Sequence, residues 1–507
     1  MALLELIYSR TWWHTVWVER RALDLAGTEI DGEMHTACTF TLESWKLVKR
    51  IILFSIATLF ASFYFIWVNA GVVQLAFLPA KPNQLAAGLF LGVSLVGLLK
   101  QENRQSLFSL IYRGRLFISA YLLFLMLQAM VGAFGEVNGS YVFILLKQAV
   151  YFACALLLAA QLNGPHRVAA LKAIYWGLLV GLVMFLAVFS VISAVIGDGL
   201  ISLIIGAIAQ GDSAALQFGV YPTLFNFVDG AILSRSDADF QGTALRNTLV
   251  GVFVLFATVL WFKPLRLGKE GFLELKLLNW ALIGCCVFFV LASVSRSNIL
   301  VLLVAACCLM ARDKNFRHQL SSRERLARGL FFAGAAALGA VLLSTLIIAV
   351  GSGLADIGAD RFGNFGQDPR VLMYSDAMRL IEQRPITGWG LGAELGSLGH
   401  RVHNLFIAAW YEGGVTLFVS SLLMYGSLII ITMRAALAPR VTSEFSNQTS
   451  KLRNGGVFAI AILPLFRPLV SGDAGAFTLI EWACIAIVLA EYANLKNAKS
   501  RRTKNVV

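Results

Sequence analysis

The chain has 507 residues, of which 58% are hydrophobic and 14% are charged, and its formal net charge is +13. Soluble domains are about half apolar and about a quarter charged, so this composition excludes an ordinary soluble protein. The apolar residues form solid runs of about twenty, the length of a membrane-crossing helix, and solid runs without alternation exclude a β-barrel. The chain is therefore predicted to be an all-α, polytopic helical membrane protein.

The positive charge and the cysteines both fit that class. Loops that face the cytoplasm are enriched in Lys and Arg, so a net charge of +13 is expected without nucleic acid as a partner. Most of the seven cysteines lie in apolar runs, where a free thiol behaves as a small hydrophobic group. No Cys/His spacing and no pair of external aspartates is typical of a metal site, and no cofactor is predicted.

Residues 1–50 precede the first apolar run and mix tryptophans with arginines, as in Arg10, Trp12 and Trp13. This mixture suits an amphipathic cytoplasmic arm that lies on the bilayer surface. A disordered tail is an equally open interpretation, because no helical periodicity decides between them. Charged residues interrupt every apolar segment before residue 51, so a signal peptide is not predicted.

About twelve candidate membrane spans follow, each an apolar run near the length that a helix needs to cross the bilayer. Their expected boundaries are 51–70, 84–99, 116–134, 141–161, 172–195, 247–263, 277–294, 298–311, 329–350, 403–433, 456–470 and 476–491. Basic residues follow the even-numbered spans, whereas the loop 135–140 has none. This alternation predicts that both termini are cytoplasmic, with residues 492–507 as a basic tail.

Two long segments then fall on the external side of the membrane. Residues 198–246 interrupt the first block of spans, 51–350, and residues 351–402 separate that block from the last one, 403–491. The second segment is the longest polar interruption near the C-terminal end of the chain. No internal repeat is visible, and inverted repeats would have favoured a transporter.

Arg296 occupies a short polar break, Ser293 to Asn298, between two apolar spans at the external side. An arginine costs about 2.5–3.5 kcal/mol at the middle of a bilayer and less near its surface. Two interpretations stay open. The guanidinium binds an anion, or it anchors the helix by reaching out to water.

Arg370 follows Asp368 and Pro369, and a proline favours the first position of a helix. Apolar residues recur at helical spacing through 371–383. We therefore expect Arg370 in the first turn of a short helix at the membrane surface, where a helix N-terminus attracts anions. A solvated arginine without a binding role is the alternative.

The next stretch, from Pro385 to Gly392, is expected to end that helix. Gly388, Gly390 and Gly392 alternate with larger residues, and glycine lets a backbone pass close to another group. A phosphate cradle is conceivable, but the strand–turn–helix context of such a loop is missing. We interpret the stretch as a tight reversal that packs under a ligand and supports the site.

His403 stands where the external segment ends and a long apolar helix begins, with Asn404 beside it. Helix N–H dipoles disfavour an imidazolium there, and a neutral imidazole accepts a proton from a hydroxyl near pH 7. Asn404 would bond a substrate or hold the ring. The alternative is a histidine that caps the helix or rests at the membrane interface.

Three charged residues intrude into the last spans: Glu412, Arg467 and Glu481. Buried acids and bases in membranes usually pair, so a structural pair is the favoured interpretation. Arg467 lies near the external end of its span, where it could also help to hold an anionic lipid.

Four motifs thus occur in a fixed order on the external side: Ser295-Arg296-Ser297, Arg370 with Tyr374, Pro385-x-x-Gly388-x-Gly390-x-Gly392, and His403-Asn404 followed by Gly414. In this order the chain resembles the O-antigen ligase and the O-antigen and exopolysaccharide polymerase superfamily of bacterial membrane glycosyltransferases. The similarity is best from about Arg235 to Met433. Leu417 departs from the ligase form of the last motif, which favours polymerisation or exopolysaccharide assembly over ligation.

The resemblance implies a GT-C-like fold in the bacterial inner membrane, with one periplasmic loop subdomain, residues 351–402, between spans nine and ten. It also implies an inverting, metal-independent transfer of a glycan from an undecaprenyl-diphosphate donor to an acceptor hydroxyl. The acceptor would be a second glycan or a lipid A core, and the partners would include membrane lipids. In this reading Arg296 and Arg370 bind the diphosphate, and His403 is the base or orients the acceptor with support from Asn404.

A rival hypothesis is a transporter or flippase for an anionic lipid or solute, in which the arginines line a path. It predicts a trail of polar residues across the bilayer, and the inner halves of the predicted spans show little of one. It also predicts an activity that does not depend on His403.

Overall fold

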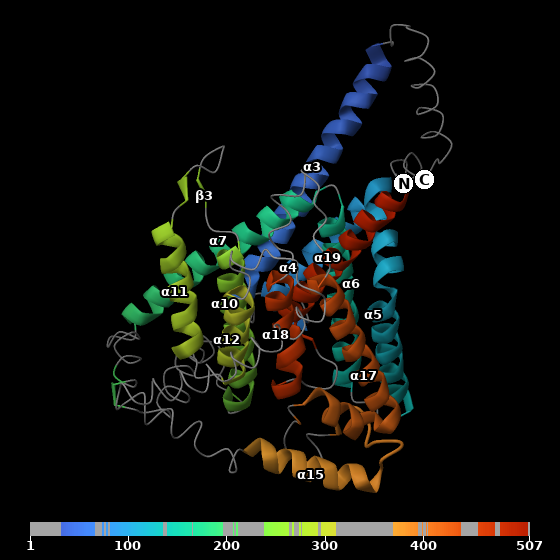
Figure 1. Cartoon of the computed structure of the whole chain (residues 1–507), viewed down its shortest axis with the longest axis vertical. Coiled ribbons are helices and arrows are strands. Elements are labelled where there is room, and N and C mark those ends of the chain that lie inside the picture. Colours follow the sequence, from blue (N-terminus) through green and yellow to red (C-terminus); the bar gives the residue numbers. More distant parts are fainter. Residues whose placement is uncertain are drawn as a thin grey trace. The chain divides into compact units, whose positions relative to one another are not determined.

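The computed structural model of the chain (Figure 1) describes residues 32–65, 74–75, 78–79, 82–134, 139–164, 166–195, 206, 209–210, 238–262, 266–267, 273–274, 276–292, 296–310, 369–393, 398, 402, 404–437, 455–471 and 477–504. The chain divides into two compact units, Met1–Ile52 and Leu53–Val507. The second unit contains the candidate site and the helices that position it.

Helices make up nearly all of the described residues. They are α3 (Gly32–Ser62), α4 (Pro82–Gly97), α5 (Gln101–Phe134), α6 (Gly139–Asn163), α7 (Arg167–Val195), α10 (Ala238–Phe262), α11 (Lys276–Ala292), α12 (Arg296–Met310), α15 (Pro369–Gln383), α17 (Leu405–Leu437), α18 (Gly455–Ser471) and α19 (Leu479–Lys504). A 3-10 turn, η1 (Phe63–Phe65), continues α3. Two short antiparallel pairs join β1 (Gln74–Leu75) to β2 (Leu78–Pro79) and β3 (Arg266–Leu267) to β4 (Leu273–Glu274).

The helices confirm the prediction of a polytopic helical membrane protein. Within the described ranges, five of them are long and apolar enough to cross a membrane: Trp45–Phe65, Gln101–Ala133, Leu145–Asn163, Arg167–Val188 and Leu405–Ala436. Every predicted span overlaps a helix except 329–350, which lies outside the described residues. The count of about twelve spans stays a prediction.

Several helices extend beyond the apolar runs from which they were predicted. Helix α5 begins at Gln101, although its apolar run begins near 116, and α19 continues to Lys504, well into the predicted basic tail. The added segments are rich in Arg, Lys, Gln and Ala, which are good helix formers. Hydropathy thus marks the part of a helix that lipid surrounds, and propensity decides where the helix ends.

Helix α7 packs unusually close to the end of α3 through two glycines. A Cβ atom built on Gly177 would lie 2.3 Å from the Ala57 carbonyl oxygen, and one built on Gly181 would lie 2.8 Å from the Ala61 Cα. Small residues spaced four apart let two membrane helices bring their backbones together. Gly177 and Gly181 therefore set the distance between α7 and the Leu53–Ser62 part of α3.

We expect Gly181→Ala to lower the thermal unfolding midpoint of the protein. The new methyl group would also lie 2.5 Å from the Tyr64 ring, and overpacking of this kind typically costs about 1–3 kcal/mol. Gly92→Ala, in α4, is the matched control because no atom lies within 4 Å of its added Cβ. Scanning fluorimetry in detergent measures both variants, and equal midpoints would contradict the close packing.

Helix α19 lies at the centre of the C-terminal helices and contacts α5, α6, α17 and α18. Its Trp482 is fully buried, and its ring lies 4.7 Å from that of Tyr121 and 5.4 Å from that of Phe152, centroid to centroid. Phe477 adds a third ring at 5.2 Å. Aromatic contacts of this kind are worth about 0.5–1.5 kcal/mol each beyond burial. They fix the start of α19, where the polar residues of the site gather.

The middle of α19 is held by polar contacts. Arg167 at the start of α7 forms an ion pair with Glu491, which is buried. The Arg113 Nη1 of α5 donates to the Ala493 carbonyl at 2.7 Å. A buried acid and base that pair satisfy each other in place of water. The start and the middle of α19 are thus anchored to neighbouring helices.

Candidate functional site

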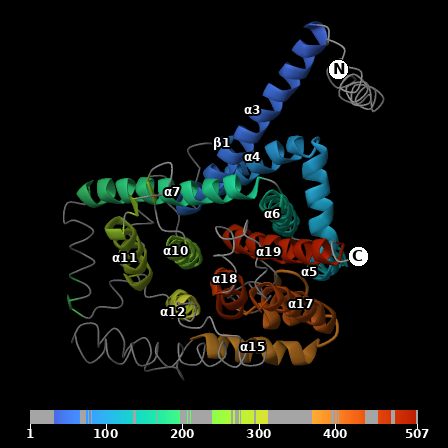
Figure 2. The same cartoon turned by 45° about the horizontal axis from the view of Figure 1, so that its top comes forward.

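The short helix predicted around Arg370 is present as α15. It begins at Pro369, and Arg370 is its second residue, as expected for a proline at the first helical position. Ala377 and Ile381 are buried, and Ala377 packs with Val402 and Ala408 at the start of α17. Figure 2 shows α15 from the side while α10 and α12 are seen nearly end-on, so α15 crosses the direction of those helices.

The stretch after α15 is a turn built on three glycines with positive φ. The φ angles are 70° at Gly388, 95° at Gly390 and 76° at Gly392, values that L side chains rarely adopt. The Trp389 indole N–H donates to the Leu380 carbonyl at 2.8 Å, which satisfies one of the last carbonyls of α15. The prediction that this stretch ends the helix in a tight reversal is confirmed.

Helix α17 is kinked opposite this turn. Gly413 (φ −124°, ψ 17°) and Gly414 (φ 63°, ψ −162°) leave the helical region, which frees backbone groups on either side of the kink. The turn satisfies those groups. Trp389 N donates to Tyr411 O and Gly390 N donates to Glu412 O, both at 2.9 Å. In the other direction, Val415 N donates to Pro385 O at 2.9 Å.

The two backbones approach so closely that only glycine fits. A Cβ on Gly388 would lie 2.5 Å from the Glu412 carbonyl oxygen, and a Cβ on Gly414 would lie 1.9 Å from the Ile386 carbonyl oxygen. The close approach predicted for these glycines is therefore present, and the partner is the backbone of α17. Because the N–H groups of Trp389 and Gly390 already bond α17, they are not free to cradle a phosphate.

Glu412 adds a side-chain contact to this junction. It is 5% exposed, and its Oε1 accepts the Gly392 N–H at 3.0 Å. A carboxylate that accepts a backbone N–H makes a charge-assisted bond, which is stronger than a neutral one. This bond holds the end of the glycine turn.

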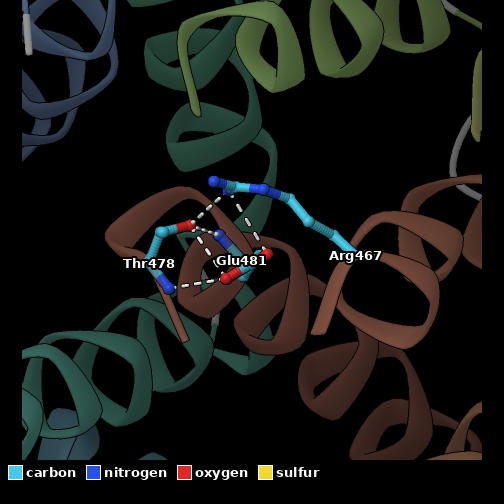
Figure 3. Close-up of polar contacts among 3 residues, drawn as sticks. All are labelled: Arg467, Thr478 and Glu481. Atoms are coloured by element: carbon cyan, nitrogen blue, oxygen red, sulfur yellow. Dashed lines mark hydrogen bonds and ion pairs between the residues drawn. The ribbon is translucent and has the colours of Figure 1, made fainter. Parts of the chain in front are cut away.

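Arg467 of α18 pairs with Glu481 of α19, as Figure 3 shows. Its Nη1 lies 3.4 Å from Glu481 Oε1 and 3.3 Å from Thr478 Oγ1, and both charged residues are almost fully buried. Thr478 and Glu481 also form a capping box at the start of α19. Glu481 Oε2 accepts the Thr478 N–H at 2.6 Å, and Thr478 Oγ1 accepts the Glu481 N–H at 3.4 Å. The structural pair expected for Arg467 is present.

Asn404 is the N-cap residue of α17. Its Oδ1 accepts the N–H groups of Phe406 at 3.0 Å and Ile407 at 3.2 Å, the usual role of an asparagine at this position. Its Nδ2 donates to the Leu469 carbonyl of α18 at 3.0 Å. Asn404 therefore joins the start of α17 to the end of α18.

His403 lies outside the described residues, but both of its neighbours are placed. Val402 before it is fully buried against α15, and Asn404 after it caps α17. The chain on either side of His403 is thus held by α15, α17 and α18.

Arg296 is the first residue of α12, and its side chain, like that of Arg370, lies outside the described set. Helix α12 packs against α18, the helix that carries Arg467 and Leu469. Asn298, two residues after Arg296, is fully buried. The convergence of Arg296, Arg370 and His403 stays a prediction, whereas the elements that bear them are connected through α17 and α18.

Sequence reasoning missed the residues that hold this junction together. Glu412 was considered only as half of an ion pair, and the hydrogen bonds of Trp389 to Leu380 and to Tyr411 were not anticipated. A signal was present, since a Gly413-Gly414 pair inside a long apolar helix is a recognised cause of a kink. Within the described ranges, no group of three His, Cys, Asp or Glu side chains is placed to hold a metal ion.

The chain was compared with known protein families and with curated proteins. A family model described as O-antigen ligase matches residues 281–422. The match begins in α11 and ends in α17, so it includes Arg296, Arg370, the glycine turn and the kink at Gly414. No curated protein matches the chain.

Proposed function

Residues 281–422 are a domain of the O-antigen ligase family, and from this premise we propose what the protein transfers and how. It moves a glycan from an undecaprenyl-diphosphate donor to an acceptor hydroxyl at the periplasmic face of the bacterial inner membrane. The family match itself supports a membrane glycosyltransferase of the O-antigen ligase and polymerase type.

One observation supports this proposal above the others. The glycine turn is bonded to the kink of α17, and it lies in the chain between the helix opened by Arg370 and the residue that precedes Asn404. A rigid junction at that point would hold a cationic helix start and an imidazole at a fixed separation. Fixed geometry of reacting groups is a major source of rate enhancement.

The chemistry proposed is a single displacement at the anomeric carbon. The bond from that carbon to the diphosphate oxygen breaks as a bond to the acceptor oxygen forms, and the configuration inverts. His403 accepts the acceptor hydroxyl proton, and the guanidinium groups of Arg296 and Arg370 stabilise the charge on the departing undecaprenyl diphosphate. The arginines supply the positive charge that a metal ion would otherwise provide, so we propose a metal-independent reaction.

We expect Arg370→Ala to reduce transfer about 10- to 100-fold, since a charge-assisted hydrogen bond contributes about 1.5–3 kcal/mol. Arg296→Ala and His403→Ala should also lose activity. Arg379→Ala is the matched control, because Arg379 is an exposed arginine of the same helix. The assay follows transfer from a lipid-linked donor, in nanodiscs, to a lipid A core and to a second lipid-linked repeat.

Full transfer by all three variants would refute the assignment of these residues. The acceptor that is consumed distinguishes a ligase from a polymerase, and the imperfect motif at Leu417 favours the polymerase. Translocation of an anionic lipid in liposomes that His403→Ala does not alter would instead support a transporter or flippase.

A further inference from the structure

From Val415 to Ile430, the exposed residues of α17 are all apolar except Thr416. Val415, Val419, Leu422 and Leu423 lie on one face at helical spacing, and Ile429 and Ile430 continue it. Residues on the other side of the helix, such as Ser420, Ser421 and Ser427, are buried in the protein. Because α17 is long and apolar enough to cross a membrane, this face is expected to contact lipid acyl chains, and we refer to it as the lipid face of α17.

The turn after α15 is attached at the beginning of this lipid face. Pro385 O accepts the Val415 N–H at 2.9 Å and the Trp410 indole N–H at 3.1 Å. The Ile386 carbonyl oxygen is the nearest atom to a Cβ built on Gly414. Ile386 thus lies beside the residue that directly precedes the lipid face.

The Ile386 side chain points away from the protein. It is 70% exposed, the largest exposed fraction of any large hydrophobic residue in the part of the chain that the structure describes. Complete transfer of such a side chain from water to an apolar phase is worth about 1.5–3 kcal/mol. Ile386 continues the lipid face of α17, so the acyl chains beside that face would provide the apolar phase.

The surroundings of Ile386 favour the same position. The Trp410 ring stacks on that of Phe418 at 4.9 Å, and tryptophan is enriched where the hydrocarbon of a membrane meets its polar surface. The exposed residues of α15 are mainly polar, including Asp376, Arg379 and Glu382. The polar side of α15 thus faces water, whereas the turn that follows it ends in an apolar side chain.

We propose that Ile386 inserts into the acyl chains of the leaflet next to this loop, so that Pro385–Thr387 anchors the loop in the membrane. The occupant of this surface is lipid. The glycine turn would then lie at the level of the lipid head groups, where a diphosphate attached to a membrane-embedded chain also lies. The proposal concerns membrane contact alone and does not depend on the proposed transfer reaction.

Site-directed spin labelling tests this position. Single nitroxide labels are attached at Ile386→Cys, Val419→Cys and Glu382→Cys in a chain whose native cysteines are replaced, reconstituted in nanodiscs of phosphatidylethanolamine and phosphatidylglycerol. Oxygen concentrates in acyl chains and a nickel chelate stays in water, so their collision rates report depth. We expect the label at 386 to collide more with oxygen, as at 419, and the label at 382 to collide more with nickel.

The ratio of the oxygen collision rate to the nickel collision rate is compared at the three labels. The proposal is overturned if this ratio at 386 is closer to the value at 382 than to the value at 419. Because Ile386 is exposed, its label should not disturb folding, and an unchanged elution volume on size-exclusion chromatography checks this. A label at Thr387, the adjacent exposed position, gives a second reading at the same loop, and it should fall between those at 386 and 382. If the labels at 386 and 387 both collide with the nickel chelate as often as the label at 382 does, the anchor is excluded.

Discussion

Replacing Gly388 by alanine is expected to lower glycan transfer by about 100-fold or more, while Gly390→Ala keeps most of it. Both glycines have positive φ, so both substitutions impose a backbone strain on the order of 1–3 kcal/mol. Only at Gly388 does the added Cβ also meet another backbone, 2.5 Å from Glu412 O and 2.6 Å from Gly414 N. Around Gly390 no atom lies within 4 Å of it.

The clash at Gly388 cannot be relieved by a side-chain rotation, because the atoms it meets belong to the kinked backbone of α17. The turn has to move away, and the bonds from Trp389 and Gly390 to α17 are then lost. A misplacement of about 1 Å far from the chemistry can cost about 100-fold in rate. The turn connects the helix of Arg370 to the segment of His403, so its displacement should act on both.

Two measurements separate the roles of strain and of the junction. Transfer from a lipid-linked donor gives the activity, and hydrogen exchange gives the protection of the Trp389 and Gly390 amides. Gly388→Ala should lose both, whereas Gly390→Ala should keep the protection of Trp389. Equal activity of the two variants would show that the contact between turn and kink is not needed for the reaction.

Glu481→Ala is expected to destabilise the folded protein by about 3–5 kcal/mol, the largest effect on stability that the described structure predicts. Removing one partner of a buried ion pair leaves a charge in a place where water cannot reach it. Arg467 is 5% exposed and lies 3.4 Å from the Glu481 carboxylate. The substitution also removes the acceptor of the Thr478 N–H, so the start of α19 loses part of its cap.

A double variant distinguishes the charge from the cap. Arg467→Met with Glu481→Leu removes both charges, and replacement of a buried pair by apolar residues is often neutral or stabilising. We expect the double variant to unfold at a higher temperature than Glu481→Ala, and Glu382→Ala, an exposed acid of α15, to behave as the unmodified protein. Thermal unfolding in detergent provides the comparison. A double variant as unstable as Glu481→Ala would show that the cap, and not the pair, is what matters.

The features that could be predicted from sequence are those that depend on neighbouring residues. The start of α15 followed from Pro369, and its buried face followed from apolar residues four apart, such as Ala377 and Ile381. The membrane helices followed from the length of apolar runs, although α5 and α19 extend beyond theirs. The family match likewise includes motifs that can be read along the chain.

The partners of the polar groups could not be predicted in the same way. Glu412 and Arg467 were both recognised as costly charges that need a partner, and an acid–base pair was the general expectation. In the structure Arg467 pairs with Glu481, while Glu412 bonds the Gly392 N–H, twenty residues away in the chain. Asn404 likewise bonds Leu469, at the far end of another helix.

Local chemistry was therefore enough to recognise a membrane protein, its helices and the glycine turn, because hydropathy, helix propensity and backbone conformation act over a few residues. Only the folded chain decided that the turn bonds the kink of α17 and that α18 holds the starts of α17 and α19. A buried polar group is satisfied by whichever group packing brings within about 3 Å of it, and that depends on the whole arrangement of the helices.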